Sequence, residues 1–149
     1  MKQEMLGIRC GKLSERHRAW GECYMADIDH IVTDMTAVEY DNRKAVALIE
    51  YKYYSNSTDL NCANIAAIED LANRASLPFF VVQYDAGDWE FLVRPRNEQA
   101  RVFVPKRTWM SESDYVCLLH RLRGKDAPTV LLDKLRGGAQ AEQDESEIE

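Results

Sequence analysis

The chain has 149 residues, 46% of them hydrophobic and 30% charged, which is typical of one globular domain with a single core. No apolar run reaches the roughly 20 residues that span a bilayer, and the first 18 residues lack the apolar core of a secretory signal. We therefore expect a cytoplasmic protein that has no membrane partner.

Charge is unevenly distributed along the chain. The net charge is −6, but residues 142–149 carry five acids and no base, so the rest of the chain has a net charge of only −1. Residues 94–136 are basic, with ten Lys and Arg against five Asp and Glu. Such a segment is compatible with a surface that faces phosphates and equally with an ordinary solvated face. We predict a single folded domain over residues 1–136 and a disordered acidic tail over residues 137–149.

The N-terminal half predicts a helix followed by a β-hairpin. Residues 13–21 contain a Ser suited to cap a helix and end at a Gly. Residues 22–32 and 45–54 are rich in strand-forming residues. Asp41 and Asn42 between them are typical of turns, so we expect these two strands to pair with each other.

The C-terminal half alternates predicted helices and strands. Residues 63–77 place four apolar residues at helical spacing, namely Ile65, Ile68, Leu71 and Ala72. Residues 79–84 form a continuous apolar run typical of a strand buried on both faces, and residues 89–95 predict an antiparallel partner. A second helix is expected over residues 111–124 and a further helical turn over residues 130–135. The fold class is α/β (α+β), with a mixed central sheet flanked by helices.

The stretch VALIEYKYY, residues 46–54, carries two opposite charges in a strongly strand-like segment. Successive side chains of a strand alternate between faces, so Glu50 and Lys52 share one face. An edge strand with one solvated face would carry such charges without any function. The preceding predicted strand carries Asp27 and Asp29 on one face by the same rule. Two acidic groups on paired strands favour a shared site.

The shared site requires an irregularity between the two strands. In a regular hairpin, Glu50 would pair with Met35 and lie roughly 20 Å from Asp29. A bulge or an irregular loop over residues 33–41 would instead bring Asp29 opposite Glu50. We include that irregularity in the prediction.

Two converging carboxylates predict a metal site. Oxygen ligands at that spacing suit Mg²⁺ or Mn²⁺ with several waters retained. Lys52 would orient the attacking water or stabilise charge that develops on a phosphate. The backbone carbonyl of Tyr51 would complete the ligand set.

Asp29 followed by Glu50-Tyr51-Lys52 on a later strand resembles the D…(D/E)-x-K signature of the PD-(D/E)XK nuclease superfamily. The resemblance implies a restriction-endonuclease-like αβββαβ core between residue 13 and about residue 84. The wider pattern SERHRAWG…DIDHI…EYD…VALIEYK is similar to that of uncharacterised phage and bacterial members. It therefore implies a phage- or prophage-encoded protein.

The same resemblance implies an activity and roles for residues. The activity is a Mg²⁺- or Mn²⁺-dependent deoxyribonuclease that hydrolyses phosphodiester bonds in DNA, with RNA left as an open alternative. Asp29 and Glu50 would hold the metal, and Lys52 would be the catalytic lysine. Asp27 is a rival ligand, because Ile28 rather than proline precedes Asp29.

Further site residues are expected on the first helix and at a strand end. The resemblance implies an accessory acid on the first helix, for which Glu15 is the candidate, although pairing with a neighbouring arginine explains Glu15 equally well. Arg16 and Arg18 beside it are the preferred phosphate contacts. Arg94 and Arg96 at a strand end would reach a backbone phosphate or solvate an edge.

The remaining chemically versatile residues have simpler explanations. We interpret His17 and His30 as structural residues. Core or rim packing accounts for Trp20, Trp89 and Trp109 better than stacking on bases does. The four cysteines lack C-x-x-C spacing and predict free thiols.

A second class of function remains open on the sequence. A nuclease-fold module without catalysis would bind a nucleic acid or a protein partner, and the near-neutral body and acidic tail suit such a module. A homodimer that cuts both strands is also left open. Metal binding that depends on Glu50 would separate the enzyme from the silent module.

Overall fold

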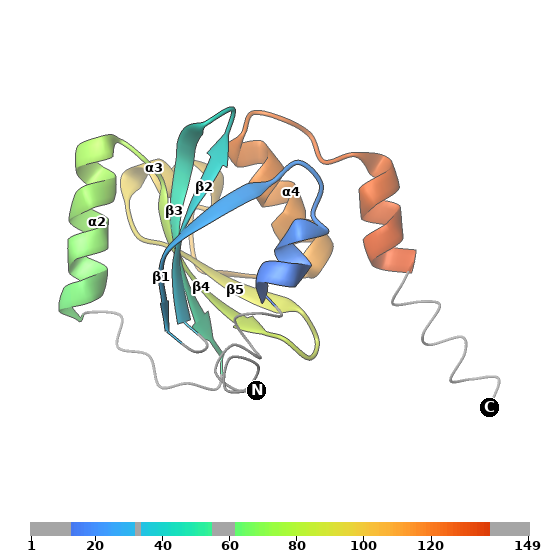
Figure 1. Ribbon diagram of the computed structural model, residues 1–149, viewed down its shortest axis with the longest axis horizontal. Coiled ribbons are helices and arrows are strands. Elements are labelled where there is room, and N and C mark those ends of the chain that lie inside the picture. The colour runs from blue at the N-terminus through green and yellow to red at the C-terminus, as the bar shows by residue number, and fades with distance from the viewer. Residues whose placement is uncertain (1–12, 32–33, 55–61, 138–149) are drawn as a thin grey trace.

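The computed structural model describes residues 13–31, 34–54 and 62–137, which form one mixed sheet with helices on both faces (Figure 1). The six strands lie in the sheet in the order in which they occur along the chain. β3 and β4 pair in parallel, and the other neighbouring strands pair antiparallel. The strands are β1 (Tyr24–Ile31), β2 (Asp34–Asp41), β3 (Lys44–Tyr53), β4 (Phe79–Asp85), β5 (Glu90–Pro95) and β6 (Thr108–Met110).

Five helices within the described residues complete an α+β fold. α2 (Ala63–Ala75) connects the parallel strands β3 and β4 and covers one face of the sheet, which we call the α2 face. α4 (Glu112–Leu122) and a helix over residues 13–18 cover the opposite face, which we call the α4 face (Figure 1). α3 (Glu98–Phe103) and a helix over residues 129–137 are the remaining two. None of the described helices is long and apolar enough to cross a membrane.

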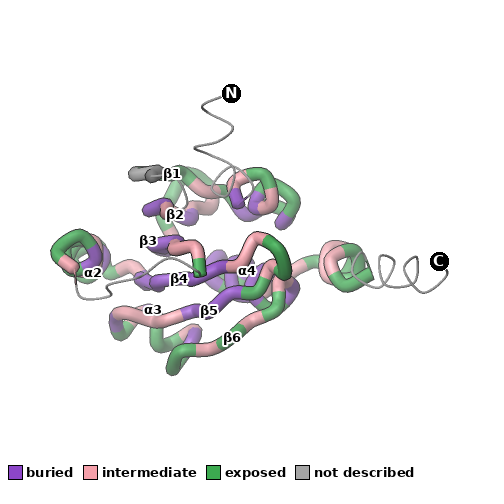
Figure 2. The backbone as a smooth tube through the Cα atoms, turned by 90° about the horizontal axis from the view of Figure 1, so that it is seen from below, coloured by how far each residue is buried: buried purple, intermediate pink, exposed green. Residues whose placement is uncertain are grey.

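Each face of the sheet has its own hydrophobic core. The larger core, on the α4 face, contains the fully buried side chains of Trp20, Tyr51, Phe91 and Tyr115. The smaller core, on the α2 face, contains Leu48, Ile65, Ala72, Phe79 and Val81. β4 contributes alternate residues to both cores and is buried from Phe79 to Tyr84, as its continuous apolar run predicts. Figure 2 shows the buried residues gathered in the middle of the molecule, between the helices.

The predicted pairing of residues 22–32 with residues 45–54 is wrong, because β2 lies between the two strands. β2 occupies residues that were expected to form an irregular loop. It places Asp34 and Thr36 on the α2 face and Glu39 on the α4 face. Polar residues on both faces remove the apolar alternation by which a strand is recognised in a sequence.

The turn predicted at Asp41 and Asn42 is present, and it joins β2 to β3. Asp41 pairs with Lys44, and Asn42 and Arg43 between them have φ values of 50° and 66°. Two successive positive φ values characterise a two-residue hairpin turn whose twist matches the flanking strands. β3 is therefore a central strand between β2 and β4, so an edge strand does not explain its charges.

The other predicted elements are confirmed in outline. The predictions missed α3 and β6, which are six and three residues long and too short to show a period. Leu71, expected on the apolar face of α2, is 49% exposed. The last described helix continues to Gly137, and the rest of the predicted acidic tail lies outside the described residues.

Candidate functional site

Four polar side chains of β2 and β3 meet on the α2 face, and we call them the β2–β3 cluster: Asp34, Thr36, Glu50 and Lys52. The Lys52 Nζ lies 3.3 Å from Asp34 Oδ2 and 3.3 Å from Glu50 Oε1. The Thr36 hydroxyl donates a hydrogen bond to Glu50 Oε2. One ammonium group therefore bridges two carboxylates on adjacent strands, and a hydroxyl group fixes one of those carboxylates.

A register shift in the β2–β3 hairpin aligns this cluster. The shift lies between Glu39 and Tyr40, close to the turn. It places Thr36 opposite Glu50, where a regular hairpin would have placed Met35. Directly opposed residues share a sheet face, so the shift gives the Glu50 carboxylate a hydroxyl partner on that face.

Lys52 is held as an ammonium group. Partial burial alone lowers the pKa of Lys52, but the charges of the Glu50 and Asp34 carboxylates and their hydrogen bonds outweigh burial. The resulting pKa lies above the ordinary lysine value. Protonated Lys52 cannot act as a general base near neutral pH, but it can stabilise negative charge on a bound anion.

A pocket of about 310 Å³ opens onto the cluster between the sheet and the N-terminal half of α2. Its other walls include Asn64, Ala67 and Ile68 of α2 and Ile28 of β1. The volume lies at the small end of the range for ligand sites. The carboxylate of Glu50, a residue that is only 8% exposed, therefore lies at the wall of a cavity that a small ligand can enter.

Asp29, the predicted metal ligand, is aligned with Glu50 but does not lie opposite it. The backbone of Asp29 pairs with Thr36, which in turn pairs with Glu50. The two acids are thus two strand spacings apart, or roughly 10 Å between Cα atoms. The side chain of Asp29 lies outside the described part of the structure. Asp27 pairs with Ala37 of the α4-face core and does not line the pocket.

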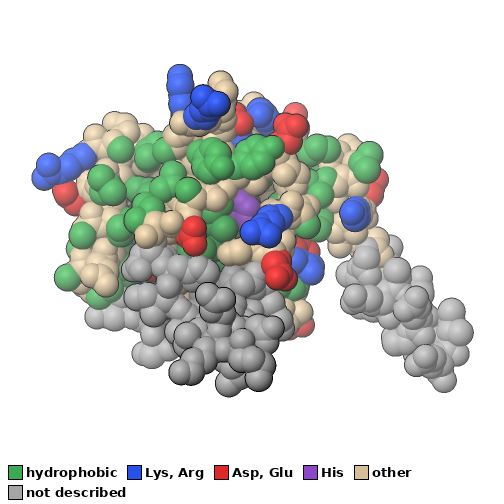
Figure 3. All heavy atoms as spheres, viewed as in Figure 1, with side chains coloured by type: hydrophobic (Ala, Val, Ile, Leu, Met, Phe, Trp, Pro, Cys, Tyr) green, Lys and Arg blue, Asp and Glu red, His purple; other side chains and the backbone are tan. Residues whose placement is uncertain are grey.

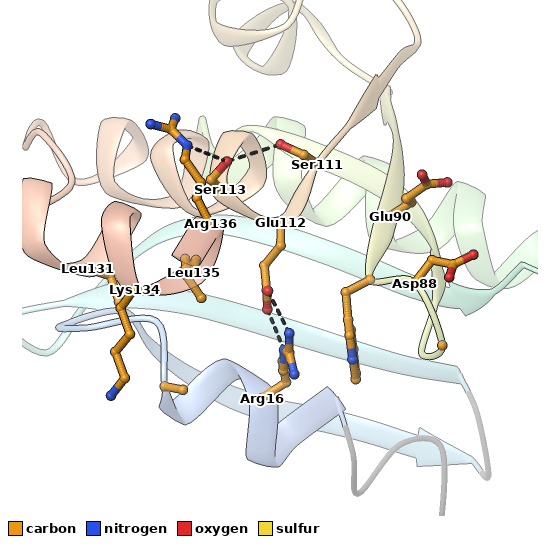
Figure 4. Close-up of a pocket in the computed structure, with 13 residues that line it drawn as sticks. Arg16, Asp88, Glu90, Ser111, Glu112, Ser113, Leu131, Lys134, Leu135 and Arg136 are labelled. Carbon is orange, nitrogen blue, oxygen red and sulfur yellow. Dashed lines mark hydrogen bonds and ion pairs between the residues drawn. The ribbon is translucent and has the colours of Figure 1, made fainter. Parts of the chain in front are cut away.

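The first helix does not bring its predicted residues to the cluster, because it packs on the α4 face. Glu15 and Arg18 are exposed there. Arg16 donates two hydrogen bonds to Glu112 at 2.5 and 2.7 Å, and its guanidinium lies 4.9 Å from the centre of the Trp89 ring. Figure 4 shows the Arg16–Glu112 pair at the wall of a second pocket of about 800 Å³. Arg16 and Arg18 are therefore poor candidates for contacts to a ligand of the β2–β3 cluster.

Arg94, in contrast, lies on the same face as the cluster. It pairs with Val81, and Val81 pairs with Glu50, so the three residues form one row across β5, β4 and β3. The Arg94 Nε donates a hydrogen bond to Gln83 Oε1 at 3.1 Å. Gln83 pairs with Lys52. The row places one guanidinium group within two strands of the charged pocket.

A small group of arginines surrounds Arg94. Partial burial lowers the pKa of Arg94, and the positive charges of Arg107 and Arg96 lower it further. Arg96 also lies 3.3 Å from Glu69 of α2. On the face that Figure 3 shows, Lys and Arg are interspersed with Asp and Glu. Arg94, Arg96 and Arg107 together raise the positive potential locally.

Sequence reasoning missed three polar residues on this face. Asp34 and Thr36 repeat with the same period of two as Glu50 and Lys52, but that signal is visible only once β2 is recognised as a strand. Gln83 is the polar residue within an otherwise apolar, buried strand, and it is 8% exposed. A polar side chain in such a run is the signal that could have identified it.

The α4 face carries a second polar cluster, the Glu39 network. Glu39 accepts a hydrogen bond from Arg123 at 2.8 Å and lies 2.7 Å from His17 Nε2. Nearby, the Cys23 Sγ lies 3.5 Å from His120 Nδ1, and burial raises the pKa of Cys23 to about 12. None of these five residues lines either pocket. His17 is therefore a structural residue, and Cys23 is a buried thiol rather than a nucleophile.

Comparison of the chain with protein-family models, with curated proteins and with solved structures gives no significant match. Within the described residues, no group of three or more His, Cys, Asp or Glu side chains is placed to hold a metal ion. The groups that the site offers for chemistry are therefore two carboxylates, a hydroxyl group and a lysine.

Proposed function

We propose that the chain is a metal-dependent nuclease of the PD-(D/E)XK type that hydrolyses phosphodiester bonds in DNA. The observation that carries the proposal is the β2–β3 cluster, in which Asp34, Glu50 and Lys52 lie in contact at one pocket. Asp34 precedes the Glu-x-Lys strand and takes the role expected of Asp29. The order helix, β1, β2, β3, α2, β4 supports the proposal, because it agrees with the implied αβββαβ core.

The donor atoms suit Mg²⁺ or Mn²⁺. Asp34 and Glu50 offer carboxylate oxygens, and Mg²⁺ is usually bound by one or two carboxylates together with waters and substrate phosphates. The side chain of Tyr51 is bonded to Tyr115 on the α4 face, so only the Tyr51 backbone carbonyl is a candidate ligand. When bound, such an ion would polarise a phosphate and lower the pKa of a water molecule.

The protein side chains then have separate roles. Asp34 and Glu50 would hold the ion, and the Thr36 hydroxyl fixes the orientation of the Glu50 carboxylate. With both carboxylates engaged in this way, the Lys52 ammonium would be available to a phosphate oxygen. There it would stabilise the charge that develops during hydrolysis. Arg94 would bind a neighbouring phosphate.

A cleavage assay with matched variants tests this proposal. The full chain is incubated with single-stranded, double-stranded and branched DNA in Mg²⁺, Mn²⁺ or EDTA, beside Glu50→Gln and Glu15→Gln. We expect metal-dependent cleavage that falls by more than about 100-fold in Glu50→Gln, since outer-shell substitutions alone cost 10- to 100-fold. Glu15→Gln, on the opposite face, should retain full activity. Equal cleavage by all three proteins would refute the assignment.

One observation favours a second candidate, the non-catalytic module. Lys52 already contacts both carboxylates and compensates one of their two negative charges without a metal. Thermal unfolding with and without Mn²⁺ separates the two candidates. A metal site should gain about 2.7 kcal/mol of stability at 100 times its Kd, and Glu50→Gln should lose that gain. A module without a metal site should show no such gain in either protein.

A further inference from the structure

Two large aromatic side chains are exposed together near the β2–β3 cluster. Tyr54 is 50% exposed and Trp109 is 52% exposed. Their ring centroids are 5.4 Å apart at an interplanar angle of 61°. Single exposed hydrophobic residues are ordinary, but two aromatic rings in contact form a continuous apolar surface. Trp20, by contrast, is fully buried.

The pair belongs to the same sheet face as the cluster. Lys52 pairs with Gln83, Gln83 pairs with Leu92, and Leu92 pairs with Trp109. Opposed residues share a face, so this row runs from the cluster across β4 and β5 to the indole. Trp109 is three strand spacings from Lys52, roughly 14 Å between Cα atoms. Tyr54 follows Lys52 by two residues, so the pair lies at one edge of the proposed site.

The row between the aromatic rings and the cluster passes over Gln83 and Leu92, and guanidinium groups lie beside it. Arg94 donates a hydrogen bond to Gln83 of this row, and the positive charges of Arg96 and Arg107 lie near Arg94. Exposed aromatic rings beside guanidinium groups are the combination with which proteins bind unpaired nucleic-acid strands. The rings stack on the flat faces of bases, and those faces are accessible only when the bases are not stacked in a duplex.

We propose that Tyr54 and Trp109 form a stacking platform for the bases of an unpaired nucleic-acid strand, whose backbone runs past Arg94 to the β2–β3 cluster. This inference deepens the proposed function, and its link to cleavage rests on that function. It assigns single-stranded or splayed nucleic acid as the substrate class. Duplex DNA would offer the platform only the bases at an open end.

Binding without cleavage tests the platform. Fluorescence anisotropy in EDTA measures binding of the full chain to a labelled oligothymidylate of about 16 nucleotides, the upper site size of single-strand-binding folds. A matched abasic oligonucleotide, with the same number of phosphates and no bases, is the control probe. Trp109→Ala and Tyr54→Ala are compared with Tyr24→Ala, because Tyr24 is equally exposed and stacks on Tyr40 at the other end of β2. A comparison of oligouridylate with oligodeoxyuridylate reports whether the 2′-hydroxyl group affects binding.

Trp109→Ala should weaken oligothymidylate binding by about 5- to 100-fold, which corresponds to the loss of one stacked base. The abasic oligonucleotide should bind wild type and Trp109→Ala equally, Tyr24→Ala should leave both affinities unchanged, and Trp109→Phe should keep most of the binding. Unchanged urea midpoints establish that the variants fold. Equal weakening for both probes, or none, would overturn the platform.

Cleavage assays distinguish failure of the platform from failure of the nuclease proposal. Glu50→Gln should fail to cut the oligothymidylate, and in that background Trp109→Ala should weaken binding by the same factor as in wild type. Platform-dependent binding by a protein that cuts nothing would uphold the platform and refute the nuclease. Cutting that is lost in Glu50→Gln, together with binding that Trp109→Ala leaves unchanged, would uphold the nuclease and refute the platform.

Discussion

The Glu39 network and the β2–β3 cluster lie on opposite faces of the same hairpin. The first joins one carboxylate to Arg123, and the second joins two carboxylates to Lys52. They differ in access to solvent. The side chains of Glu39 and Arg123 are 0% and 1% exposed, whereas those of Lys52 and Asp34 are 19% and 32% exposed. The first cluster is sealed beneath α4 and the first helix, and the second lines a pocket.

This difference supports a structural role for the Glu39 network and leaves the β2–β3 cluster accessible to a ligand. A sealed ion pair cannot exchange partners with a ligand, so its role is to orient the elements that it joins. Arg123 also donates hydrogen bonds to the carbonyls of Tyr24 and Tyr40, which ties the end of α4 to β1 and β2. In an open cluster, a ligand can compete for the charges.

Removal of Glu39 should cost the most stability. Glu39→Ala leaves the buried Arg123 guanidinium without its carboxylate, so we expect a loss of about 3–5 kcal/mol in the free energy of unfolding, measured by urea denaturation. Glu50→Ala, in the open cluster, should cost much less. The paired replacement of Glu39 and Arg123 by methionine should restore most of the stability, because no charge is then left alone. Equal losses of unfolding free energy in Glu39→Ala and Glu50→Ala would contradict the distinction between a sealed and an open cluster.

Removal of the Lys52 charge should act on activity rather than on stability. Lys52→Met keeps the aliphatic chain and deletes the ammonium, and we expect a fall in kcat of about 10²- to 10³-fold, as for other preorganised groups that stabilise transition-state charge. The free energy of unfolding should change by only about 1 kcal/mol, since the pair is partly exposed. Single-turnover cleavage and urea denaturation give the two numbers. If Lys52→Met unfolds instead, the role of Lys52 is to stabilise the fold.

Removal of the Thr36 hydroxyl should have a smaller effect on the same reaction. Thr36→Val deletes the donor that orients the Glu50 carboxylate, and outer-shell groups of this kind are worth about 10- to 100-fold in metal affinity or activity. The expected signature is a weaker apparent affinity for Mn²⁺ in cleavage titrations. Thr108→Val, on β6, is the matched control and should leave the titration unchanged.

The sequence predicts the components of the site better than their arrangement. The period of two correctly places Glu50 and Lys52 on one face, and both line the pocket. It does not show that Asp34 joins them, because β2 carries polar residues on both of its faces and resembles a loop. An irregularity over residues 33–41 was expected, and the shift between Glu39 and Tyr40 lies in that range, but it brings Thr36 rather than Asp29 opposite Glu50.

The role of the first helix was also beyond local reasoning. Glu15, Arg16 and Arg18 look like a charged functional helix in the sequence. Arg16 pairs instead with Glu112, a residue 96 positions further along the chain. Such a long-range partner is set by the packing of the first helix against α4, which no local pattern predicts. In contrast, the buried strand β4 was predicted correctly, because burial on both faces leaves a direct apolar signal.

Stability at alkaline pH should show that Tyr51 and Tyr115, in the core on the α4 face, are shielded from water. The hydroxyl groups of Tyr51 and Tyr115 lie 2.6 Å apart, and burial holds the pKa of both well above the ordinary value. In the unfolded chain each tyrosine ionises near pH 10, so only the unfolded state loses these protons there. The tyrosine contribution to stability should therefore be complete below about pH 10 and be lost above it, by about 1.4 kcal/mol per tyrosine at pH 11, whereas the buried Cys23 thiol contributes a loss that begins nearer pH 9. Urea midpoints at pH 8 and 11 measure the loss. The double variant Tyr51→Phe with Tyr115→Phe should remove the tyrosine part of the loss, whereas Tyr54→Phe, at an exposed tyrosine, should not. An equal loss in wild type and both variants would show that ionisation of Tyr51 and Tyr115 does not cause it.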